Sequence, residues 1–243
     1  MRKIAIISPK GGVGKTVISV NLAMALTQLN QRVFLMDLDL KISGVASQLG
    51  IFSIPVSLNE VLLGKANIFG AIYIHPSGLR VIPTSLSLSE YKLDRLDEVL
   101  SMFNGEGFLI VDTPPTLSKE YLELYNLFDE LILVTTPELP SIVASLKLLK
   151  EIESSKVRGI VVNRWKKSDK IKPYYLEEVF GIKVIGIIPE SKIVRKSLEK
   201  RVPAVYYKPS SKFSRSIKRL ASHLAGIPYK EGFKEKIRGW LGI

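Results

Sequence analysis

Ser8-Pro9-Lys10-Gly11-Gly12-Val13-Gly14-Lys15-Thr16 follows the first apolar run of the chain, residues 4–7, and precedes a segment with helical periodicity. A glycine-rich turn between a strand and a helix lets successive backbone N–H groups point into one concavity, where the helix N-terminus adds partial positive charge. This arrangement is typical of a loop that cradles phosphate groups. We expect the Lys15 ammonium to reach the β- and γ-phosphates of a nucleotide, and the Thr16 hydroxyl to coordinate Mg²⁺.

The loop departs from the strict phosphate-loop pattern at its first position, where Pro9 replaces glycine. The Gly-Lys-Thr ending and its place between a strand and a helix still predict a site for ATP with Mg²⁺. The predicted nucleotide-binding residues of this segment are Lys10, Gly11, Gly12, Val13, Gly14, Lys15, Thr16 and Val17.

Short β-branched runs alternate with helical patterns along most of the chain. The predicted strands are residues 4–7, 33–36, 79–82, 108–111, 131–134, 157–162 and 184–188, mostly buried on both faces. Apolar residues at helical spacing fall in residues 15–29, 90–103, 138–152 and 210–225. The alternation predicts an α/β fold with a mainly parallel, twisted sheet and helices on both faces. Residues 72–74 and 79–82, joined through Pro76-Ser77-Gly78, predict a hairpin at one edge.

The composition excludes several kinds of chemistry. The 243 residues include no Cys, so disulfides, iron–sulfur clusters and thiolate zinc sites are ruled out. The two histidines, His75 and His223, lie far apart in the sequence and do not suggest a metal site. No apolar run reaches the roughly 18 residues of a membrane span, and residues 1–7 do not resemble a secretory signal. We therefore expect a cytoplasmic protein.

Positive charge is concentrated at the C-terminal end. Residues 1–149 hold 12 Lys and Arg against 14 Asp and Glu, a balance of −2. Residues 150–243 hold 23 against 9, a balance of +14. This asymmetry indicates a polyanionic partner, either nucleic acid or an anionic membrane surface, unless it is only a solvated basic face.

Acidic and amide side chains follow several predicted strands, where parallel-sheet proteins place ligand-binding groups. Asp37 and Asp39 end the second strand, so their carboxylates are candidates for holding a metal or positioning a water. Asp112 ends the apolar run of residues 108–111, as in a Walker B strand, and is expected to hold Mg²⁺ through water. The predicted metal residues are thus Thr16, Asp37 and Asp112.

Lys-Gly-Gly-Val-Gly-Lys-Thr, with the additional lysine Lys10, resembles the deviant Walker A loop of the MinD/ParA family of ATPases. The resemblance implies ATP hydrolysis by Lys10, Lys15 and Asp39, with Lys10 reaching the nucleotide of a partner subunit in an ATP-dependent homodimer. It implies that Asp39 orients the attacking water and that Asp37 lies near the Mg²⁺ shell. It also implies adenine contacts at Asn163, Arg164 and Pro189. The sequence departs from common family patterns at Gly44, where the MinD branch often has Asn, and at Thr116, where Gly is usual.

Residues 227–243 form a tail after Gly226, which divides the chain into an ATPase domain, 1–226, and a membrane-targeting segment. As a helix, this tail would present an apolar stripe bordered by lysines, which is typical of a helix lying in a membrane interface. The residues predicted to meet the membrane are Phe233, Lys234, Lys236, Ile237, Trp240 and Leu241. The alternative is a helix that docks on its own domain. The MinD branch carries a C-terminal membrane helix of this kind.

The leading hypothesis is a MinD-like spatial regulator, peripheral on the inner face of the cell membrane, whose hydrolysis is stimulated by a protein partner. The main rival is a ParA-like ATPase that binds DNA without sequence specificity. Its candidate contacts are Lys192, Arg195, Lys196, Lys200, Arg201, Lys212, Arg215, Lys218 and Arg219. A metal-centre or cofactor-insertion ATPase would typically need Cys pairs, and a small-molecule kinase would need an acceptor site that the sequence does not show.

Overall fold

A computed structural model describes residues 1–86, 90 and 92–229. Its centre is an eight-stranded sheet in the order β3-β4-β2-β5-β1-β6-β7-β8. Neighbouring strands run parallel except β3 and β4, which pair antiparallel at one edge. The strands are β1 Arg2–Ile7, β2 Val33–Asp37, β3 Tyr73–Ile74, β4 Arg80–Ile82, β5 Phe108–Asp112, β6 Glu130–Thr135, β7 Val157–Trp165 and β8 Val184–Pro189.

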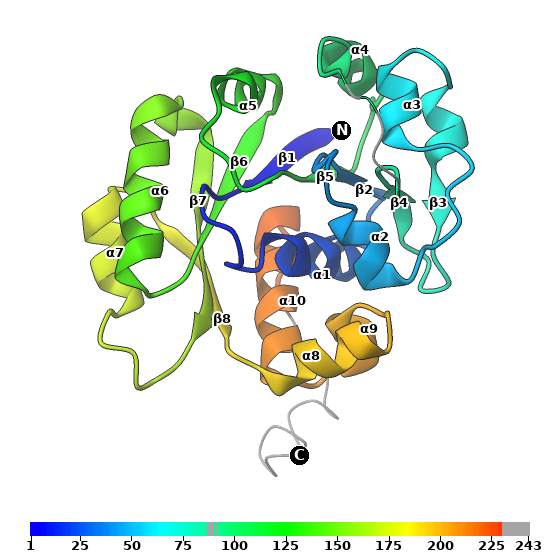
Figure 1. The fold of residues 1–243 in the computed structure, drawn as a ribbon. Helices are drawn as coiled ribbons and strands as arrows, with labels where there is room; N and C mark the ends of the chain where they lie inside the picture. Colours follow the sequence, from blue (N-terminus) through cyan, green and yellow to red (C-terminus); the bar gives the residue numbers. More distant parts are fainter. Residues whose placement is uncertain (87–89, 91, 230–243) are drawn as a thin grey trace.

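Helices cover both faces of this sheet (Figure 1). They are α1 Lys15–Gln28, α2 Gly44–Leu49, α3 Leu58–Leu62, α4 Leu96–Ser101, α5 Lys119–Leu124, α6 Leu139–Glu151, α7 Pro173–Phe180, α8 Lys192–Glu199, α9 Ala204–Tyr207 and α10 Lys212–Ala225, with short 3-10 helices at Ile68–Ala71, Tyr125–Leu127 and Ser154–Lys156. The predicted fold class is therefore confirmed.

The central strand β1 shows how the sequence produces two cores. Successive side chains of a strand point to opposite faces. Ile4 and Ile6 accordingly pack with residues of α1 and α10, whereas Ala5 and Ile7 pack on the opposite face with residues of α3 to α7. All four side chains are fully buried. The sheet thus fixes β1 rigidly, and with it the phosphate loop that follows.

Two sequence-based expectations about single elements need correction. The helix expected over residues 90–103 is shorter, because α4 spans only Leu96–Ser101. Leu93 and Phe103 are buried as their spacing predicted, but they lie in turns that flank the helix. The strand β8 is only partly buried because it forms an edge of the sheet and has a neighbouring strand on one side only. The predicted hairpin at the other edge is confirmed by β3 and β4.

The last helix, α10, ends at Ala225, and Gly226 caps it in a left-handed conformation with φ of 66°. Glycine adopts this conformation without steric cost, which makes it a common helix terminator. The predicted domain boundary at Gly226 coincides with this end. The membrane residues Phe233, Lys234, Lys236, Ile237, Trp240 and Leu241 lie outside the described residues. Within the described part of the chain, no helix has the length and apolar character needed to span a membrane.

Candidate functional site

The phosphate loop connects the end of β1 to the first turn of α1, in the centre of the sheet. Gly12 and Gly14 have φ values of 77° and 92°, which turn the backbone before the helix begins at Lys15. Asn163, at the end of β7, donates a hydrogen bond from Nδ2 to the Val13 carbonyl at 2.7 Å. The predicted residue Asn163 therefore supports the loop directly, and its amide packs against the Gly14 backbone.

We expect Gly14→Ala to destabilise this loop more than an ordinary glycine substitution. An alanine Cβ there would lie 2.4 Å from Asn163 Nδ2, in addition to the cost of a left-handed backbone. The overlap should add about 1–3 kcal/mol to a backbone cost of about 1 kcal/mol. Thermal unfolding without nucleotide measures this loss. Gly78→Ala is the matched control, because Gly78 has φ of 86° but open space at its Cβ position. Equal losses for the two variants would show that the contact with Asn163 is unimportant.

Two carboxylates meet at the ends of β2 and β5. Asp37 and Asp112 are paired in register on these neighbouring strands, and both side chains are buried. Asp37 accepts hydrogen bonds from the backbone N–H groups of Asp39 and Val45, each at 3.1 Å. Asp112 Oδ1 accepts a 2.8 Å hydrogen bond from Ser19 Oγ, and Thr16 also bonds to this carboxylate.

Burial raises the pKa of both carboxyls. The pKa of Asp37 lies well above its ordinary value because of burial and the nearby Asp112 charge. Burial raises the pKa of Asp112 to about 6, against the lowering effects of hydrogen bonds from Thr16 and Ser19. Burial also lowers the pKa of Lys15, although Asp112 and Asp39 favour its charged form. The site therefore gathers negative charge that a single lysine does not balance.

This donor set fits Mg²⁺ bound together with a nucleotide. Thr16 and Asp112 offer hard oxygen ligands beside the loop, and Asp37 lies next to them. Among residues 1–86, 90 and 92–229, no three Asp, Glu, His or Cys form a cluster that could hold a metal by themselves.

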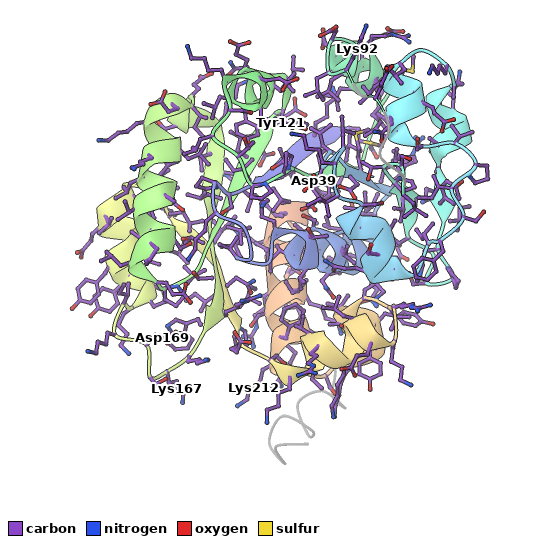
Figure 2. All side chains as sticks on the ribbon, in the orientation of Figure 1. Asp39, Lys92, Tyr121, Lys167, Asp169 and Lys212 are labelled. Carbon is purple, nitrogen blue, oxygen red and sulfur yellow. The ribbon has the colours of Figure 1, made fainter. Side chains whose placement is uncertain are left out.

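The segment between β2 and α2 approaches the loop from the side. Asp39 is half-buried, and its carboxylate accepts a hydrogen bond from Ile42 N at 3.2 Å. Burial raises the pKa of Asp39, while Lys15 and the backbone N–H groups of Ile42 and Lys41 oppose the shift. Tyr121 Oη donates to the Leu38 carbonyl at 3.3 Å, so α5 holds this segment near the site (Figure 2). Asp39 thus lies close enough to Lys15 for their charges to interact.

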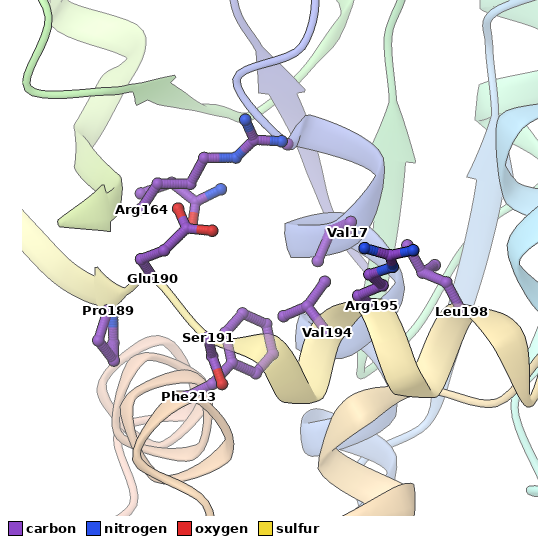
Figure 3. A pocket seen from close by; sticks show the side chains of 11 residues that line it. Val17, Arg164, Pro189, Glu190, Ser191, Val194, Arg195, Leu198 and Phe213 are labelled. Atoms are coloured by element: carbon purple, nitrogen blue, oxygen red, sulfur yellow. The ribbon is translucent and has the colours of Figure 1, made fainter.

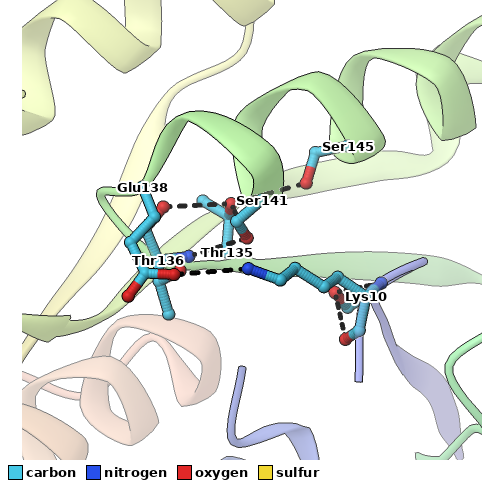
Figure 4. A network of polar contacts seen from close by, with 7 residues as sticks. Lys10, Thr135, Thr136, Glu138, Ser141 and Ser145 are labelled. Atoms are coloured by element: carbon cyan, nitrogen blue, oxygen red, sulfur yellow. Dashed lines mark hydrogen bonds and ion pairs between the residues drawn. The ribbon is translucent and has the colours of Figure 1, made fainter. Parts of the chain in front are cut away.

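Lys10 is directed away from its own phosphate loop. Its Nζ lies 3.3 Å from Glu138 Oε2, on the turn between β6 and α6 (Figure 4). That turn is held by a hydrogen bond between the Ser141 and Thr135 hydroxyls at 2.9 Å and by one that Thr136 N donates to Ser141 Oγ at 3.2 Å. The two ion-paired side chains are 35% and 63% exposed, so the pair is weak and Lys10 can leave it.

A cavity of about 200 Å³ adjoins the phosphate loop (Figure 3). Its lining includes five of the predicted nucleotide residues: Gly14, Val17, Asn163, Arg164 and Pro189. The remaining lining residues come from α8, from the segment before it and from the start of α10: Glu190, Ser191, Val194, Arg195, Leu198 and Phe213. A partly apolar cavity of this kind, beside a phosphate loop, suits a nucleotide base.

The structure brings the predicted phosphate, metal and base residues together at the carboxyl-terminal ends of the parallel strands. The contributors that were not predicted include Ser19, Glu138, Tyr121 and Phe213. Ser19 lies one helical turn after Lys15, so helical spacing alone places it on the same face. No sequence signal locates Glu138 or Tyr121 at the site, because both reach it through tertiary packing.

A phosphate loop on a central parallel strand, two buried carboxylates on neighbouring strand ends and an adjacent base cavity define a P-loop nucleotide-binding protein. Residues 4–204 match the CobQ/CobB/MinD/ParA nucleotide binding domain, and the chain belongs to this family. The predicted family is therefore confirmed.

Similar proteins extend over nearly the whole chain. An uncharacterized ATP-binding protein of Methanocaldococcus jannaschii is 37% identical over 245 residues, which cover 98% of this chain and 93% of that protein. The cell division ATPase MinD of Pyrococcus furiosus superposes with a TM-score of 0.86 at 30% identity, covering 93% and 98% of the two chains. The septum site-determining protein MinD of Pyrococcus horikoshii, solved with Mg-ADP, gives a TM-score of 0.85 at 28% identity over 92% and 95%. These findings agree with the predicted cofactors, ATP and Mg²⁺.

Proposed function

We propose that this protein is a Mg²⁺-dependent ATPase that forms a homodimer with ATP and attaches to the inner face of the cell membrane through its C-terminal tail. The observation that carries the dimer is the direction of Lys10, which extends from the loop to Glu138 instead of turning into its own cradle. A lysine in this place can meet a second copy across the phosphate loop once the weak ion pair opens. Membrane attachment rests on the tail sequence and on relatives named MinD.

Each residue of the site has a distinct task in the proposed hydrolysis. The loop N–H groups and Lys15 bind the phosphates, while Thr16 and Asp112 would hold Mg²⁺, which neutralises developing charge on the phosphate oxygens. Asp39 accepts a hydrogen bond from the attacking water and fixes its direction. Asn163 supports the loop backbone, and Val17, Arg164 and Pro189 contact the base. A protein partner that stimulates hydrolysis would act on the segments around Asp39 and Thr116.

Lys10→Ala is expected to retain nucleotide binding within about tenfold but to lose ATP-induced dimerisation. The backbone cradle and Lys15 remain, whereas the cation that reaches the second subunit is removed. Light scattering after size-exclusion chromatography, with Mg²⁺ and a non-hydrolysable ATP analogue, measures the dimer. Lys65→Ala, a substitution at an exposed lysine away from the site, is the control. A Lys10→Ala chain that dimerises with unchanged affinity would refute this role.

Removal of residues 227–243 tests the membrane attachment. We expect the full chain to cosediment with anionic vesicles when ATP is present, and the chain ending at Gly226 to remain in the supernatant. The physical reason is that two tails on one dimer bind with much greater avidity, roughly 10²-fold or more, than one. Nucleotide binding by the shortened chain is the control for folding. Unchanged vesicle binding after the removal would refute membrane attachment through the tail.

The alternative function is ATP-dependent binding of DNA without sequence specificity. It is favoured by the basic residues of α8 and α10, two helices that lie near one another at the same end of the molecule (Figure 1). In the truncation experiment, loss of vesicle binding would favour the tail, whereas ATP-dependent binding to duplex DNA unaffected by truncation would favour this alternative.

A further inference from the structure

A second groove lies next to the base cavity, between α10 and the ends of β7 and β8. Its volume is about 310 Å³. Three cationic side chains line it, Lys212, Arg215 and Arg219, together with the apolar surfaces of Trp165, Ile187 and Pro189. Pro189 also lines the base cavity, so the two depressions are neighbours. Nothing in the nucleotide chemistry described above uses this groove.

The cations come to the groove because of their spacing on α10. Lys212, Arg215 and Arg219 are three and four residues apart, which places them along one face of a helix. The other face of α10, with Phe213, Ile217 and Leu220, is buried against the sheet and α1. The helix is thereby fixed with its cationic face outward, and the three charges form a preorganised site.

Trp165 lines the same groove with its indole ring. Its Nε1 is buried and has no hydrogen-bond partner among the described residues. Three cations beside an apolar wall suit a ligand with several anionic oxygens, and a phosphate group has this chemistry.

We propose that this groove binds the phosphate-containing headgroup of an anionic phospholipid, as a second membrane contact beside the tail; the inference rests on the proposed membrane attachment. Tyr229, the last described residue before the tail, lies under the Arg219 guanidinium, which is 5.5 Å from its ring centroid. The groove therefore adjoins the last described residue of the chain. Ile187, 43% exposed, gives the rim an apolar surface that suits the glycerol and upper acyl region of a lipid.

A nucleic acid fits these observations less well. Its evenly spaced phosphates would be met by a row of cations along the surface, and the exposed lysines of α8 would contribute as much as those of α10. The groove instead concentrates its donors in one depression. Binding at the groove therefore predicts that substitutions within it have a larger effect than an equal loss of charge on α8.

Trp165 provides a direct reporter of the groove. The chain has two tryptophans, so Trp240→Phe leaves Trp165 as the single fluorophore and keeps an aromatic residue in the tail. With ATP and Mg²⁺ present, this chain is titrated with phosphatidylcholine vesicles that contain or lack phosphatidylglycerol, with soluble glycerol phosphate, with inorganic phosphate and with a DNA duplex. We expect the Trp165 emission to change with the phosphatidylglycerol vesicles and, at higher concentration, with glycerol phosphate, but not with pure phosphatidylcholine.

A matched pair of variants separates the groove from general electrostatic attraction. Lys212→Ala with Arg215→Gln should weaken binding to the anionic vesicles by about tenfold or more and abolish the Trp165 response. Lys196→Ala with Lys200→Gln, which removes equal charge from α8 and its C-cap, should weaken binding by no more than about threefold and keep the response. Thermal unfolding confirms that both variants fold. Equal losses in the two variants would overturn the proposal.

The remaining outcomes distinguish the groove from the membrane function on which it rests. Vesicle binding without any Trp165 response would overturn the groove and leave tail-mediated attachment intact. If the chain does not bind vesicles, the membrane function fails, and a lack of response to glycerol phosphate would remove the groove as well. A response to the DNA duplex, or to inorganic phosphate as strong as to glycerol phosphate, would show that the groove does not recognise a lipid headgroup.

Discussion

Lys15→Met is expected to weaken the binding of Mg²⁺-ATP by more than a hundredfold, because it removes the cation that the phosphate loop directs at the phosphates. Lys15 is only 6% exposed, and its charged form is favoured by Asp112 and Asp39. A charge-assisted hydrogen bond in such a place contributes up to about 3 kcal/mol, and each 1.4 kcal/mol corresponds to a factor of ten. Methionine keeps the apolar stem, so the loop should retain its packing.

Isothermal titration calorimetry with Mg²⁺-ATP measures the loss, and Lys65→Met is the control with the same chemical change at an exposed position. The expected pattern is a large loss for Lys15→Met beside unchanged binding for Lys65→Met. A Lys15→Met chain that binds within tenfold of the natural chain would mean that the backbone N–H groups hold the phosphates without this lysine.

The sequence predicts the phosphate-binding and metal-binding residues of the site because short, continuous segments of the sequence identify them. Residues 8–16 contain both the loop and the start of α1, and strand ends such as Asp37 and Asp112 are visible as acidic residues after apolar runs. Since parallel strands end at the same edge of a sheet, these residues must come together once the fold is right.

Contacts that depend on tertiary packing cannot be predicted from the sequence in this way. Lys10 meets Glu138 across 128 positions, and Tyr121 bonds to Leu38 across 83 positions. Neither pair has a periodic or compositional signal, because the contact depends on how α5 and α6 pack on the sheet. The short helix α4 illustrates the same limit, since apolar spacing over residues 90–103 predicts the buried face but not where the helix begins.

The basic segment shows a further consequence of packing. The charge balance of residues 150–243 predicts a polyanionic partner, but it does not distinguish a diffuse surface from a defined groove. The packing of α10 on the sheet places Lys212, Arg215 and Arg219 along one groove with Trp165, and the basic residues of α8 do not line this groove. The location of these charges is therefore a property of the tertiary structure.

Asp112→Asn is expected to have two opposite effects, loss of Mg²⁺-dependent nucleotide binding and a more stable protein in the absence of ligands. The first effect follows from removing a carboxylate ligand, since an amide offers Mg²⁺ no charge. The second follows from burial, which raises the pKa of Asp112 from 3.8 to about 6 in the folded protein. Asparagine removes the charge that makes this site costly when neither Mg²⁺ nor nucleotide is present.

The sign of the pH dependence follows from that pKa. The folded protein binds a proton on the Asp112 carboxyl more tightly than the unfolded chain does, so protonation of this carboxyl stabilises the fold. This stabilisation is complete below about pH 4 and is lost as the pH rises through about 6. A shift of this size corresponds to a change on the order of 3 kcal/mol in the free energy of unfolding. The natural chain should therefore lose stability relative to Asp112→Asn over this range.

Denaturant unfolding with a chelator, at several pH values between 4 and 7, measures this difference between the two chains. Asp94→Asn, at an exposed position between β4 and α4, controls for the loss of one carboxylate. If the natural chain and Asp112→Asn keep the same difference in stability at every pH, the buried charge of the Asp112 carboxyl is not what destabilises the unliganded protein. A variant that is both more stable without ligands and unable to bind Mg²⁺-nucleotide would show that the fold tolerates this buried charge for the sake of binding.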